Sequence, residues 1–87
     1  MNQNNYELKF EYTNRKAFHY PDDLKAAYEI LEKDEYAILN VTIPSPENKG
    51  MVDQMRITQK DLKGKTFEGI EAAINKWADE RRDASNS

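Results

Sequence analysis

The stretch Tyr36-Ala37-Ile38-Leu39-Asn40-Val41-Thr42-Ile43 decides the fold, because it is the most apolar segment of the chain. Its odd-numbered positions carry only aliphatic side chains, and its other face consists of Tyr36, Ile38, Asn40 and Thr42. Apolar residues on both faces are typical of a strand in the interior of a sheet. We therefore expect residues 36–43 to form a central strand.

Three further segments are predicted to pair with this strand. Residues 6–13 alternate strictly between aromatic or aliphatic side chains and charged or polar ones, which predicts a strand with one buried face. A turn at Asn14-Arg15 and a short strand over residues 16–20 would complete a hairpin, since Asn tolerates the left-handed conformation. After a loop, residues 51–59 predict a fourth strand, whose apolar face is interrupted by Asp53 near an end or at a bulge.

Two amphipathic helices are expected, one after each pair of strands. Pro21 ends the second strand and Asp22 can cap the first helix. The apolar stripe of that helix is Leu24, Ala27, Tyr28 and Leu31. A basic connection over residues 60–65 then leads to Thr66, a suitable N-cap for the last helix. The stripe of the last helix is Phe67, Ile70, Ala73, Ile74, Trp77 and Ala78.

The resulting order is strand–strand–helix, taken twice. It predicts an α+β fold with a four-stranded, mostly antiparallel sheet and both helices on one face. We expect a single domain over residues 6–82, with disordered ends over residues 1–5 and 83–87. The spacings of the two halves differ and their residues hardly match, so the order alone does not establish a repeat.

Size and composition limit the classes of function. A chain of 87 residues makes one domain and leaves little room for a deep cleft. It contains no cysteine, its net charge is −3, and its first twenty residues hold no continuous apolar run. We therefore expect no disulfide, no secretory signal and no membrane span, and residence in the cytoplasm as a monomer or homodimer.

The sequence offers no catalytic set. His19 is the only histidine, and the serines lie in a proline-flanked loop (Ser45) or near the end of the chain (Ser85, Ser87). A two-histidine mechanism, a Ser–His–acid triad and a histidine metal cluster are therefore not expected. We predict a protein without enzymatic activity, metal or cofactor.

Two groups of cations are candidates for binding nucleic acid or another anion. Lys63 and Lys65 precede the last helix, whose N-terminus attracts anions. Lys9, Arg15, Lys16 and Arg56 lie in or near the predicted strands, where cations next to stacking groups suit single-stranded nucleic acid. Glu7, Glu11 and Asp53 dilute this charge. Nucleic-acid binding is therefore the alternative hypothesis.

Protein binding is the leading hypothesis. Tyr36, Ile38 and Asn40 should lie on the side of the sheet that the helices leave uncovered, and an exposed aromatic–aliphatic pair with a charged rim is typical of an interface. An edge strand could also pair with a partner; the first hairpin and residues 51–59 are the candidates. We expect a small intracellular module that regulates or inhibits a protein partner. Many proteins of this size and composition are encoded by phages and mobile elements.

Overall fold

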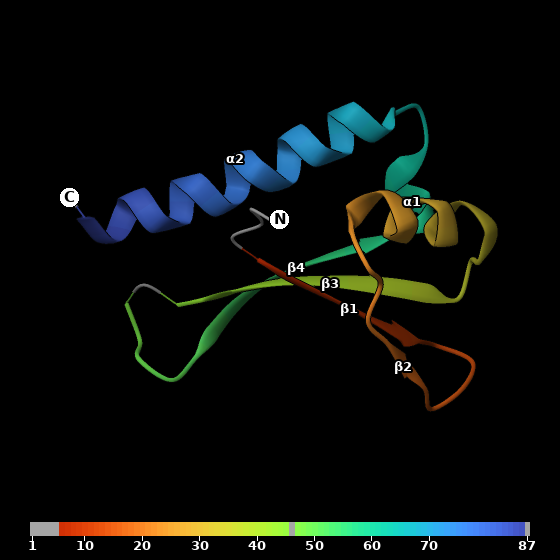
Figure 1. The fold of residues 1–87 in the computed structure, drawn as a ribbon, viewed down its shortest axis with the longest axis horizontal. Helices are drawn as coiled ribbons and strands as arrows, with labels where there is room; N and C mark the ends of the chain where they lie inside the picture. Colours follow the sequence, from red (N-terminus) through yellow and green to blue (C-terminus); the bar gives the residue numbers. More distant parts are fainter. Residues whose placement is uncertain (1–5, 46, 87) are drawn as a thin grey trace.

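The computed structural model describes residues 6–45 and 47–86, with side chains described up to Arg82. It has the expected order of elements and the expected α+β architecture (Figure 1). In chain order the elements are β1 (Glu7–Tyr12), β2 (Phe18–His19), α1 (Leu24–Lys33), β3 (Ala37–Pro44), β4 (Val52–Thr58), the 3-10 helix η1 (Gln59–Leu62) and α2 (Phe67–Asn86). The prediction for residues 1–5 lies outside the described residues, as does that for Ser87.

The four strands form one antiparallel sheet in the order β2-β1-β3-β4. The prediction that β3 is central is confirmed, because β3 pairs with β1 on one side and with β4 on the other. Phe10 lies opposite Leu39, and Leu39 lies opposite Ile57, so these three side chains share one face. Strands β2 and β4 are the two edges.

Both helices cover this face of the sheet, as predicted (Figure 1). The core combines the inward residues of the strands with the apolar stripes of the helices. Its buried members are Leu8, Phe10, Leu24, Ala27, Leu31, Ala37, Leu39, Val41, Ile57, Leu62, Ile70 and Ile74. Ala73, which we assigned to the stripe of the last helix, is exposed, while Ile70, Ile74 and Ala78 face inward.

Short polar contacts fix where the helices begin. The Asp23 carboxylate accepts a hydrogen bond from the backbone N–H of Ala26 at 2.8 Å, so Asp23 and not Asp22 caps α1. The hydroxyl of Thr66 accepts from the N–H of Gly69 at 3.0 Å, which confirms Thr66 at the start of α2. The basic connection before it folds into η1, which buries Leu62 in the core.

Two elements differ clearly from the prediction in their bounds. Strand β2 has two residues in place of five, because the connection from Thr13 to Lys16 is longer than a two-residue turn. Helix α2 continues to Asn86, past the expected end at Arg82. No proline or glycine follows Gly69, so nothing in the sequence stops the helix there.

Asp53 lies near the start of β4, on the inward face of the sheet, opposite Ile43. The end-of-strand interpretation of this residue is therefore correct. The Nε of Arg81 in α2 donates to the Asp53 carboxylate at 2.8 Å. This ion pair explains how a carboxylate is tolerated on the side of the sheet that faces the helices.

Candidate functional site

The face of the sheet turned away from the helices carries the candidate site. We call it the open face. Strand alternation and register give its members as Phe18, Tyr20, Glu7, Lys9, Glu11, Ile38, Asn40, Thr42, Val52, Gln54, Arg56 and Thr58. No helix of the described chain lies across this side of the sheet (Figure 1).

Large apolar side chains lie exposed at both edges of the open face. Phe18 is 66% exposed and Tyr20 is 69% exposed at the β2 edge, and Val52 is 59% exposed at the β4 edge. The ammonium of Lys9 lies 4.5 Å from the centroid of the Phe18 ring. Exposed apolar side chains of this size make the open face a candidate site.

These apolar residues were missed at the sequence level. We assigned Phe18 and Tyr20 to a five-residue strand and named neither of them, nor Val52, as a candidate for binding. Their alternation with His19 held the signal, since His19 lies opposite the buried Phe10 and its two neighbours must point the other way.

Between the two edges the open face is hollowed. The hollow has a volume of about 470 Å³. Tyr20 and Val52 line it from opposite sides, and Asn40, Thr42 and Gln54 contribute polar groups. Glu7, Lys9 and Glu11 complete the lining along β1, together with part of Leu8.

Asn40 lies at the centre of the open face, opposite Lys9 of β1 and Arg56 of β4. We expected an exposed contact residue, but Asn40 is only 5% exposed. Its Oδ1 is buried and accepts no hydrogen bond. A buried acceptor left without a partner costs about 1–3 kcal/mol, so Asn40 Oδ1 is a candidate to accept a hydrogen bond from a bound group.

The charges of the open face are unevenly satisfied. Arg56 forms an ion pair with Glu11 at 3.5 Å. The ammonium of Lys9 lies over the Phe18 ring. Both cations that flank Asn40 therefore have contacts on the side of Glu11 and Phe18. Glu7, at the other end of β1, forms no ion pair within the described chain. The hollow is therefore locally acidic at its Glu7 end.

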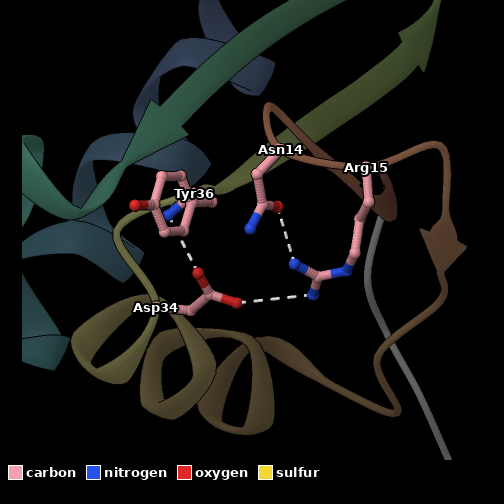
Figure 2. A network of polar contacts seen from close by, with 4 residues as sticks. All are labelled: Asn14, Arg15, Asp34 and Tyr36. Carbon is pink, nitrogen blue, oxygen red and sulfur yellow. Dashed lines mark hydrogen bonds and ion pairs between the residues drawn. The ribbon is translucent and has the colours of Figure 1, made fainter.

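Arg15 and Tyr36 belong to a separate network at the end of the sheet (Figure 2). Arg15 donates to the Asn14 side chain at 2.7 Å and forms an ion pair with Asp34 at 3.6 Å. Its guanidinium also lies 3.9 Å from the centroid of the Tyr12 ring. Asp34 accepts a further bond from the backbone N–H of Tyr36 at 2.8 Å. Arg15 therefore ties the first hairpin to the start of β3.

Tyr36 and Ile38 are placed differently from each other. Tyr36 is 43% exposed just before β3 begins, and a hydrogen bond to Glu35 is the main cause that raises the pKa of its phenol above 10.0. Ile38 is half-buried between Glu11 and Thr58. Ile38 thus lies on the open face and Tyr36 lies next to it, before the strand begins. Neither residue lines the hollow.

The remaining predicted cations do not join this surface. Lys16 is exposed in the connection between β1 and β2. Lys63 and Lys65 are exposed between η1 and α2, on the side of the sheet that carries the helices (Figure 1). The structure therefore separates Lys63 and Lys65 from Lys9 and Arg56.

His19 is exposed on the edge strand, with its ring centroid 6.0 Å from that of Phe10. Within residues 6–45 and 47–86, no group of three or more His, Asp or Glu side chains is placed to hold a metal ion. Over the same residues, no helix has the length and apolar character needed to cross a bilayer.

Comparison of the chain with protein-family models, with curated proteins and with solved structures found no match in any of the three.

Proposed function

We propose that this chain is a non-enzymatic binding module that regulates or inhibits a protein partner through the open face of its sheet. It would act in the cytoplasm, as a monomer or homodimer. The observation that carries the proposal is the exposure of Phe18, Tyr20 and Val52 on the one uncovered side of the sheet, where Tyr20 and Val52 line a polar hollow.

The composition of this surface supports a protein partner. Aromatic residues are enriched at interfaces, and a few desolvated anchor residues carry most of the binding energy. Here the apolar side chains stand at the two edges, and the buried amide of Asn40 lies between them. The face can therefore offer both contact area and hydrogen bonds.

The test compares the native chain with a variant that carries Phe18→Ser, Tyr20→Ser and Val52→Ser. All three side chains are more than half exposed, so the variant should fold, as circular dichroism would verify. Partners are captured from the native cell, purified, and titrated against both chains by calorimetry. Loss of two or more anchor residues should weaken binding by at least about 30-fold.

The matched control is Ala72→Ser with Ala73→Ser, two exposed positions of α2. This control also replaces apolar surface by hydroxyls, but away from the open face. The proposal is wrong if the control loses affinity while the triple variant keeps it.

Single-stranded nucleic acid is the second candidate partner, favoured by the exposed rings of Phe18 and Tyr20 next to Lys9. Against it stand Glu7 on the same face and the ion pair that engages Arg56. Each phosphate contact adds about 0.7 to the salt slope of affinity for single strands. A fluorescently labelled oligonucleotide that shows no binding at low salt would remove this candidate.

A further inference from the structure

We infer that the hollow of the open face is a receptor for an arginine side chain of the protein partner. This inference rests on the proposed function and names the chemistry that the partner must present. It uses three groups of the hollow: the Asn40 amide, the Glu7 carboxylate and the Tyr20 ring.

The Asn40 amide supplies a hydrogen-bond acceptor that has no partner. Its Oδ1 is buried and unpartnered, and Asn40 is one of the residues that line the hollow. The terminal torsion of Asn is broad, so a small rotation turns this oxygen toward an incoming group. The occupant should therefore carry N–H or O–H donors.

The Glu7 carboxylate supplies the charge. Glu7 makes no ion pair in the described chain, whereas the Glu11 carboxylate is already paired with Arg56. Lys9 also lines the hollow and forms no ion pair among the described residues, but its ammonium lies over the Phe18 ring. Phe18 pairs with Glu11, which is four residues along β1 from Glu7. The charge at the Glu7 end is therefore that of the Glu7 carboxylate, which favours a cationic group there.

Tyr20 contributes an aromatic side chain to the lining from the β2 edge, and Val52 lines the hollow from the β4 edge. A guanidinium stacks on an aromatic ring while its N–H groups point outward in the plane, which an ammonium cannot do. Its five donors could serve Asn40 Oδ1 and Glu7 together. Among cationic side chains, arginine therefore fits the hollow better than lysine.

The test uses N-acetyl-arginine N-methylamide as the probe and the corresponding citrulline derivative as its neutral control of the same shape. Nuclear magnetic resonance of the ¹⁵N-labelled chain follows the side-chain amides of Asn40 and Gln54 during titration. A single side chain should bind with a Kd on the order of 1 mM. The shifts should cluster around the hollow, and citrulline should bind more weakly.

Variants assign the contacts. Glu7→Gln should weaken arginine binding about 3–5-fold, since it removes one exposed ion pair. Glu29→Gln, the same change at an exposed position of α1, should have no effect. Tyr20→Leu keeps an apolar wall but removes the ring, and should reduce the preference for arginine over the matching lysine derivative.

Several outcomes would overturn the inference. Equal binding of arginine and citrulline, or shifts away from the hollow, would show that charge recognition does not occur there. Binding of a single-stranded oligonucleotide to the open face, without binding of arginine, would favour a nucleic-acid partner. If a captured protein loses binding to the Phe18, Tyr20 and Val52 variant but the arginine probe does not bind, the proposed function stands and this inference fails.

Discussion

Replacement of Asn40 by leucine should stabilise the protein. Asn40 Oδ1 is buried without a partner, and the side chain makes no hydrogen bond within the described residues. Leucine has nearly the same shape and needs no partner. The change therefore removes an unsatisfied group worth about 1–3 kcal/mol and adds a favourable apolar contact.

The expected rise in the free energy of unfolding is about 1–3 kcal/mol, and each kcal/mol should raise Tm by about 4–8 °C in a domain of this size. Urea denaturation measures the free energy, followed by the fluorescence of Trp77, which packs partly buried against the core. Thr42→Val is the control, because Thr42 is half-buried on the same strand and face. It should change stability by less than about 0.5 kcal/mol.

A loss of stability in Asn40→Leu would refute this reasoning, since it would show that the amide has a structural partner. If stability rises and arginine binding is lost, the amide is kept for function at the expense of stability. Such a trade is expected where a binding site needs polar groups in a buried position.

Two further predictions concern contacts that hold the fold. In a double-mutant cycle of Asp53→Ala and Arg81→Ala, the coupling energy should be about 0.2–1 kcal/mol and should fall with added salt, because the pair is partly exposed; a coupling near zero in low salt would contradict the role given to the pair. Burial, and then the charge of Glu71, raise the pKa of the Tyr6 phenol above 10.0. The folded state thus disfavours the phenolate, so this contribution to stability is complete below pH 10 and is lost as the pH rises through the raised pKa. Urea midpoints measured from pH 8 to 12 should fall less steeply for Tyr6→Phe than for the native chain, and equal slopes would refute the assignment.

The sequence was sufficient for the architecture because the period of its apolar residues is clear. Residues 36–43 predicted a central strand, and the apolar stripes that include Leu24 and Ile70 predicted two helices on one side of the sheet. The exact ends of the helices and strands were harder to predict from the sequence. Neighbouring Asp22 and Asp23 are both good caps, and only the backbone geometry at Asp23 decides between them.

The site was only partly predictable. The alternation in β3 correctly indicated an uncovered face that includes Ile38 and Asn40, but the burial of Asn40 depends on side chains from neighbouring strands. The exposure of Phe18 follows from its place in an edge strand of two residues. Strand propensity does not tell which strand lies at the edge of a sheet. Likewise, the pairing of Arg56 with Glu11 joins residues 45 positions apart.

A map of the interface in the complex with a purified partner tests the central claim most directly. Cross-saturation from the unlabelled partner to the labelled chain reports which residues lie at the contact. The account predicts transfer to Phe18, Tyr20 and Val52, and to the side-chain amide of Asn40. Transfer confined to the exposed positions of α1 and α2 would contradict it.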